Sequence, residues 1–153
     1  MMRVKATLLV LLAVFLLAPG ALPNADAADN VRLSFGRPGG EKADIIFSSW
    51  KRSAKAIVIK TTQVGVAGSR LFLEVDKRPT PIVDHILAES ECRFGDNTGS
   101  CEIAISGLSA EYRKIVRAFR RGRTLHIGIV TAGAMKMSED VSLSGFKTSY
   151  GRL

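Results

Sequence analysis

Histidine, cysteine and aromatic residues are scarce in this chain, and this scarcity excludes most ways of building a catalytic or metal site. The 153 residues include two histidines, two cysteines and one tryptophan, and 7% of the residues are aromatic. Neither His85 nor His126 has another histidine at metal-ligand spacing, and no serine lies in a Gly-x-Ser-x-Gly turn. The sequence therefore predicts no catalytic residue, no metal site and no cofactor.

Two loop segments also lack the residues that a phosphate loop or a calcium loop needs. The segment 36–40 contains glycines but lacks the lysine and the helix start of a phosphate-binding loop. The segment 96–99 is too short for a calcium loop and has no terminal glutamate. We predict that both are turns. Because no repeat, long linker or low-complexity tract follows the first 27 residues, we also predict a single domain over 28–153.

The first 27 residues have the pattern of an export signal. Arg3 and Lys5 form a positive start, and the mostly apolar run 6–18 follows. This run is shorter than the ~20 residues that a helix needs to cross a bilayer. Ala25 and Ala27 provide the small residues that a signal peptidase reads. We expect a signal peptide (1–27), a periplasmic or secreted protein, and no transmembrane segment after cleavage; a retained membrane anchor is the alternative.

Basic residues are in excess. The formal net charge is +8, and Arg3, Lys5 and Asp26 are the charged residues of the expected signal, so the remaining domain carries about +7. A charge of this size favours anionic partners, such as lipid head groups or lipopolysaccharide. The alternative is that the charge only keeps an exported protein soluble.

Cys92 and Cys101 are expected to form a disulfide. Both lie in the exported part, nine residues apart, and the segment 93–100 between them is rich in turn-forming residues. The spacing differs from the Cys-x-x-Cys of redox-active pairs. In the chain-entropy model a loop this short stabilises a domain by about 2–3 kcal/mol.

Short apolar stretches separated by turn residues predict an all-β domain, an antiparallel sandwich or open barrel. Alternation is clearest in 70–76, where Leu71, Leu73 and Val75 face one way. Segment 82–91 is ambiguous between strand and helical turn, and 51–53 is short enough for a hairpin. The predicted strands are 31–35, 44–50, 54–62, 70–76, 101–106, 124–131 and a last one containing Val141 and Leu143.

One packed α-helix is predicted near 109–121. Ser109 is a suitable N-cap, the basic residues of the last turn match the helix dipole, and Gly122 suits a left-handed stop. Apolar residues recur at helical spacing on one face, which we expect to pack on a sheet. These residues are Tyr112, Ile115, Val116 and Phe119.

The opposite face of this helix is the candidate functional surface, because five cations lie within nine residues there. They are Arg113, Lys114, Arg117, Arg120 and Arg121. Arginine forks bind phosphates and carboxylates, so an anion-binding face is predicted; a solvated helix face is the alternative. Aromatic residues do not interleave with the cations, which argues against binding of single-stranded nucleic acid.

The second half of the chain resembles the invasion-associated locus B family, periplasmic or surface proteins of alphaproteobacteria. The resemblance covers about residues 91–153 and depends on the order of short motifs. These are Cys92, Cys101-Glu102-Ile103-Ala104, Gly122-Arg123-Thr124-Leu125 and Ser142-Leu143-Ser144-Gly145-Phe146. The resemblance implies a β-rich periplasmic domain linked to host-cell invasion or to the envelope, without established catalysis.

Two function classes follow. The first is a non-enzymatic periplasmic or envelope-associated protein that binds an envelope or host protein, or an anionic lipid or lipopolysaccharide surface. The alternative is a small periplasmic enzyme or enzyme inhibitor with its site residues on loops. A deep polar pocket holding a histidine beside carboxylates would favour the enzyme, and a flat basic face would favour the binder.

Overall fold

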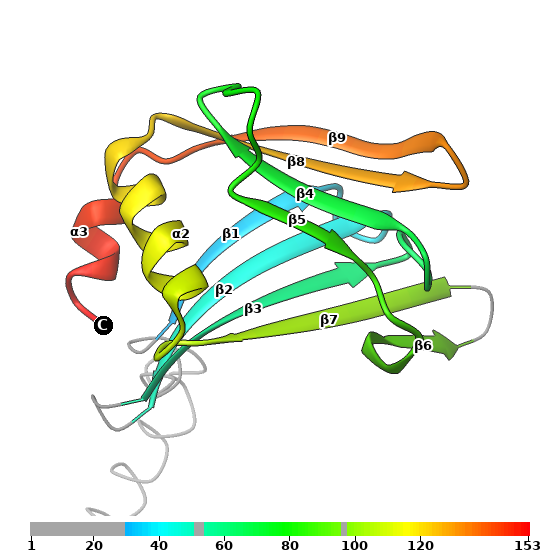
Figure 1. Ribbon diagram of the computed structural model, residues 1–153, viewed down its shortest axis with the longest axis horizontal. Helices are drawn as coiled ribbons and strands as arrows, with labels where there is room; N and C mark the ends of the chain where they lie inside the picture. Colours follow the sequence, from blue (N-terminus) through cyan, green and yellow to red (C-terminus); the bar gives the residue numbers. More distant parts are fainter. Residues whose placement is uncertain (1–29, 51–53, 96–97) are drawn as a thin grey trace, which may run out of the picture.

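The computed structural model describes residues 30–50, 54–95 and 98–153, and there the chain forms two antiparallel β-sheets that face each other, with helices at one end (Figure 1). The first sheet has the order β1-β2-β3-β7-β6. Its strands are β1 (Asn30–Gly36), β2 (Lys42–Trp50), β3 (Ala54–Thr62), β7 (Thr98–Ser106) and β6 (Cys92–Gly95). The second has the order β5-β4-β8-β9. Its strands are β5 (Val83–Ile86), β4 (Arg70–Val75), β8 (Thr124–Thr131) and β9 (Ala134–Ser142).

This architecture confirms the predicted β-rich sandwich with a packed helix. The ambiguous segment 82–91 divides into β5 and a short 3-10 turn, η1 (Glu89–Glu91). The predicted last strand is β9, which contains Val141 but ends at Ser142, so Leu143 lies just beyond it. Its pairing with β8 starts at Ala134 and has one register shift, between Ile129 and Val130. The predicted signal (1–27) and the turn at 51–53 lie outside the described residues, as does part of the predicted turn at 96–99.

The core lies between the two sheets and consists of the inward residues of each period-2 pattern. Ile45, Ile57 and Ile59 of the first sheet are completely buried. Leu71 and Ile127 of the second sheet are equally buried. Side chains alternate between the two faces of a strand, so the residues between these positions lie on the outer faces.

Two helices lie side by side at one end of the sandwich, α2 (Ala110–Arg121) and the shorter α3 (Phe146–Tyr150) (Figure 1). The Ser109 side chain accepts a hydrogen bond from the Tyr112 amide, which confirms the predicted N-cap. The predicted apolar face of α2 is buried, also as expected. Phe119 packs edge-on against Phe47 of β2 and against Phe146 of α3, with ring centroids 5.5 and 5.4 Å apart.

Gly122 ends α2 for a different reason from the one predicted. Its φ is −81° and its ψ is 165°, so the expected left-handed stop is wrong. A Cβ at this position would lie 2.1 Å from Cγ1 of Val75 and 3.1 Å from Cδ1 of Leu143. Glycine is required here because the chain passes too close to β4 for any side chain.

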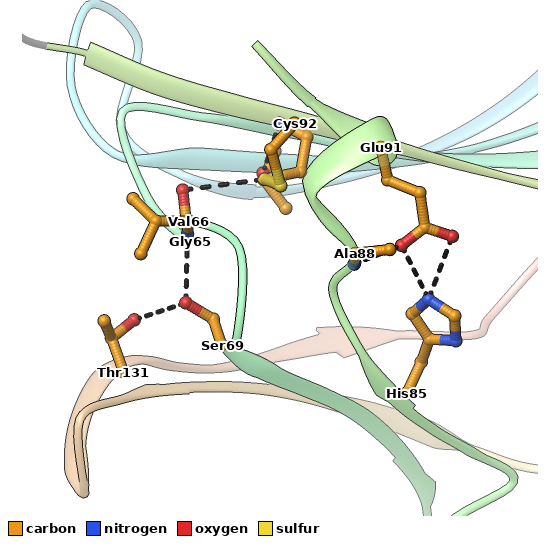
Figure 2. Close-up of a disulfide and its surroundings, with 10 residues drawn as sticks. Gly65, Val66, Ser69, His85, Ala88, Glu91, Cys92 and Thr131 are labelled. Carbon is orange, nitrogen blue, oxygen red and sulfur yellow. Dashed lines mark hydrogen bonds and ion pairs between the residues drawn. A yellow bond between two sulfur atoms is a disulfide. The ribbon is translucent and has the colours of Figure 1, made fainter. Parts of the chain in front are cut away.

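The predicted disulfide between Cys92 and Cys101 is confirmed (Figure 2). The two residues are direct partners across β6 and β7, and both are buried. The Cys101 amide donates a hydrogen bond to Oγ1 of Thr61 on β3. The bridge therefore ties the edge strand β6 to the central part of the first sheet.

Below the disulfide, hydrogen bonds fix the ends of β4 and β5 (Figure 2). Oε2 of Glu91 accepts from the Ala88 amide and also contacts Nε2 of His85, both at 2.8 Å. The backbone donor, and then His85, lower the pKa of Glu91. Oγ of Ser69 accepts from the Val66 amide and contacts Oγ1 of Thr131. His85 is thus in a structural contact at the surface of the sandwich.

No helix in the described ranges is long and apolar enough to cross a membrane.

Candidate anion-binding groove

The α2 cations lie on the solvent side of the helix, as the sequence predicts. The side that carries Tyr112, Ile115 and Phe119 is buried, and this fixes the rotation of α2 about its axis. All five predicted site residues are exposed. They are Arg113, Lys114, Arg117, Arg120 and Arg121.

Four of these cations line a groove between α2 and α3. Its volume is about 550 Å³, and α3 contributes Lys147 and Tyr150 to it. The full lining is Tyr112, Arg113, Val116, Arg117, Arg120, Arg121, Lys147 and Tyr150. The groove therefore brings five positive charges and two phenol hydroxyls to one surface.

The two tyrosines form a hydrogen-bonded pair in this groove. The hydroxyl oxygens of Tyr112 and Tyr150 are 2.8 Å apart. Burial is the largest cause that raises the pKa of Tyr112, so its phenol stays protonated at neutral pH. Two hydroxyls hold two protons, and their mutual bond uses one of them. The second proton can be donated to an acceptor in the groove.

The groove cations have no acidic partner among the described residues. Every ion pair found in those ranges involves other basic residues: Lys42, Lys60, Arg70, Lys77, His85 and His126. Within the groove, Nη1 of Arg113 donates to the carbonyl oxygen of Leu108 at 3.0 Å, which is a neutral acceptor. The positive charge of the groove is thus not neutralised by neighbouring carboxylates.

A second, smaller hollow lies on the other flank of α2, against the end of β4. Its volume is about 280 Å³, and it is lined by Val75, Asp76, Arg78, Lys114, Arg117, Ala118, Arg121 and Gly122. Oδ1 of Asp76 accepts hydrogen bonds from the backbone amides of Arg123 and Thr124, at 2.9 and 3.0 Å. These bonds lower the pKa of Asp76, so its carboxyl group is ionised at neutral pH. The hollow therefore holds one carboxylate together with four cations, Arg78, Lys114, Arg117 and Arg121.

A third hollow, on the outer face of the second sheet, contains the other histidine. Glu74, His126 and Asp140 are direct partners across β4, β8 and β9 and form one row. Nδ1 of His126 is 2.6 Å from Oδ1 of Asp140, and this bond is the largest cause that lowers the Asp140 pKa. Lys77 and Ser138 complete the lining of this hollow, whose volume is about 330 Å³.

In this arrangement Asp140 holds the imidazole of His126 through Nδ1. An ionised carboxylate only accepts, so the proton of this hydrogen bond is on Nδ1. No hydroxyl of the described residues is hydrogen-bonded to Nε2. His126 is partly buried beside the ring of Phe72, with ring centroids 6.1 Å apart. In the same ranges, no three His, Cys, Asp or Glu side chains gather as a possible metal site.

The sequence identified the cations of α2 but not the residues that close the two hollows around them. Lys147 and Tyr150 of α3 and Arg78 after β4 line these hollows, yet they are distant from α2 in the chain. The motif Ser142-Leu143-Ser144-Gly145-Phe146 stood directly before Lys147, but by itself it did not predict a helix.

Comparisons with known protein families, with curated proteins and with solved structures find no match to this chain. The similarity of residues 91–153 to the invasion-associated locus B family therefore stays a prediction from sequence motifs.

Proposed function

We propose that this protein is a non-enzymatic, envelope-associated protein that binds anionic surfaces through the groove between α2 and α3. The observation that carries the proposal is the groove lining. Arg113, Arg117, Arg120, Arg121 and Lys147 lie beside a protonated tyrosine pair, and no described carboxylate pairs with them. Arginine and tyrosine donors suit phosphate or carboxylate acceptors.

The proposed location is the periplasm or the outside of the cell. The signal-like pattern of residues 1–27 supports it, and so does the Cys92–Cys101 disulfide, because such bonds persist in oxidising compartments. The resemblance to the invasion-associated locus B family is a further argument for an envelope role. An anionic lipid or lipopolysaccharide surface is then the partner that the cations would meet first.

A double variant tests this proposal. Arg117→Ala with Arg120→Ala removes two groove cations and leaves the buried face of α2 unchanged. Basic residues near an anionic membrane contribute about 1 kcal/mol each, so we expect about 30-fold weaker binding to anionic vesicles at low salt. Binding by the parent should also weaken as salt rises, because salt screens exposed charges.

The matched control is Arg37→Ala with Lys136→Ala. Both residues are exposed, neither lines the groove, and the same charge is removed. We expect this control to bind vesicles nearly as well as the parent. Equal binding by the groove variant and the parent at low salt would refute the proposal. An equal loss in both double variants would show that only net charge matters.

The competing candidate is a small enzyme that uses His126. The observation in its favour is the bond between Nδ1 of His126 and Asp140, because both residues line one polar hollow. A screen of ester, peptide and glycoside hydrolysis with the parent and with His126→Gln tests it. Turnover that disappears in His126→Gln would replace our proposal with this candidate.

A further inference from the structure

The groove and the second hollow share two residues, Arg117 and Arg121, which lie one helical turn apart. Each hollow also has cations of its own: Arg113, Arg120 and Lys147 for the groove, Arg78 and Lys114 for the second hollow. The helix thus has a basic hollow on each flank, with Arg117 and Arg121 along the crest between them.

We propose that the two hollows together bind one ligand that carries two phosphate monoesters, one in each hollow, with its linking part across the crest of α2. This inference rests on the proposed function and narrows it from anionic surfaces in general to a diphosphorylated molecule. A single anion would use only one of the two hollows.

The lining of each hollow suits a phosphate dianion. In the groove, the unused proton of the Tyr112–Tyr150 pair adds a neutral donor to the five cations, and phosphate oxygens accept from both kinds of donor. In the second hollow, Asp76 offsets one of four cations, but its Oδ1 already accepts from two backbone amides. The excess positive charge there remains available to a ligand.

The width of the helix sets the distance between the two phosphates. An α-helix with its side chains is about 10–12 Å across, so the phosphates must be separated by a spacer of about that length. Two phosphates on adjacent carbons would not reach both hollows. Linking two weak contacts through a spacer that fits can raise affinity by about 100-fold or more.

Calorimetry at low salt with soluble probes tests the inference. The probes are octanediol bisphosphate, ethanediol bisphosphate and the monophosphate of octanediol. We expect octanediol bisphosphate to bind with one ligand per protein, at least about 100-fold tighter than the monophosphate. Ethanediol bisphosphate should bind about as weakly as the monophosphate.

Two single variants separate the hollows, since Arg78→Ala alters only the second hollow and Lys147→Ala only the groove. Each variant should bind octanediol bisphosphate at least about 10-fold more weakly than the parent does, which removes most of the difference in affinity between this probe and the monophosphate. The control pair Arg37→Ala with Lys136→Ala should preserve it. A long bisphosphate that binds no tighter than the monophosphate, or that binds twice per protein, would overturn the inference. An Arg78→Ala variant with unchanged affinity would do the same.

Vesicles distinguish the source of the two phosphates. We compare vesicles of a lipid with two phosphates on its head group with vesicles of phosphatidic acid at equal phosphate content. Preference for the former assigns the ligand to the membrane, and tight binding of octanediol bisphosphate without that preference assigns it to a soluble molecule. If Arg117→Ala with Arg120→Ala abolishes vesicle binding while the bisphosphate shows no advantage, only the inference fails and the proposed function stands.

Discussion

Replacing Phe146 with alanine tests how α3, and with it one wall of the groove, is fixed to the sandwich. Phe146 is only 3% exposed. Its ring lies 4.9 Å from that of Phe47, 5.4 Å from that of Phe119 and 5.5 Å from that of Tyr150, measured between centroids. It is the only residue of α3 that is fully buried, and the half-buried Tyr150 is the other aromatic residue of this helix that packs against Phe47.

The expected loss is about 3–5 kcal/mol of unfolding free energy, the usual cost of truncating a buried phenylalanine to alanine. Three aromatic neighbours place Phe146→Ala in the upper half of that range, since aromatic pairs contribute beyond their buried area. Phe146→Leu keeps most of the volume and should cost less than about 1.5 kcal/mol. It also provides a folded variant if Phe146→Ala is too unstable to purify.

Urea unfolding followed by circular dichroism measures this loss. With a slope of about 2 kcal/mol per molar urea, the midpoint of Phe146→Ala should fall by about 2 M at an unchanged slope. Affinity for octanediol bisphosphate should fall as well, because this probe needs the groove and because Lys147 and Tyr150 of the groove belong to this helix. A loss below about 1 kcal/mol, or full affinity in Phe146→Ala, would show that the aromatic cluster does not position α3.

Two further predictions concern the disulfide and acid stability. Cys101→Ser should lower the unfolding free energy by about 2–3 kcal/mol and leave a folded domain, because the loop it opens is short; two free thiols in the denatured, non-reduced parent would contradict the bridge. Backbone amides of Arg123 and Thr124 lower the pKa of Asp76 in the folded state. The stability that these hydrogen bonds give the fold is therefore complete above the pKa of Asp76 in the unfolded chain. It is lost as the pH falls through the lower pKa of Asp76 in the folded state. Urea midpoints should therefore fall more between about pH 6 and pH 3 in the parent than in Asp76→Asn, and equal falls would refute this.

Much of the fold was predictable because its signals are local. Alternation in 70–76 placed Leu71, Leu73 and Val75 in the core, and the structure buries all three. Helical spacing and the Ser109 cap predicted α2 with its buried face. In both cases the periodic pattern directly reflects which side of the element is buried.

Other features had no local signal. The helix α3 has five residues, too few to show a helical period, and it is held by Phe47 and Phe119 from distant segments. Gly122 satisfied the rule for a left-handed stop, but its extended backbone and the close approach of Val75 decide its role. Neither contact can be read from neighbouring residues in the chain.

For the candidate site, the sequence by itself determined that five cations share the exposed side of one helix, because helical periodicity fixes which residues lie together. Only the tertiary structure decided what surrounds them. It brings Arg78 to one flank of α2 and Lys147 and Tyr150 to the other, and it pairs Tyr150 with Tyr112. These residues meet because the aromatic cluster and the two sheets pack together, and such long-range packing leaves no periodic trace in the sequence.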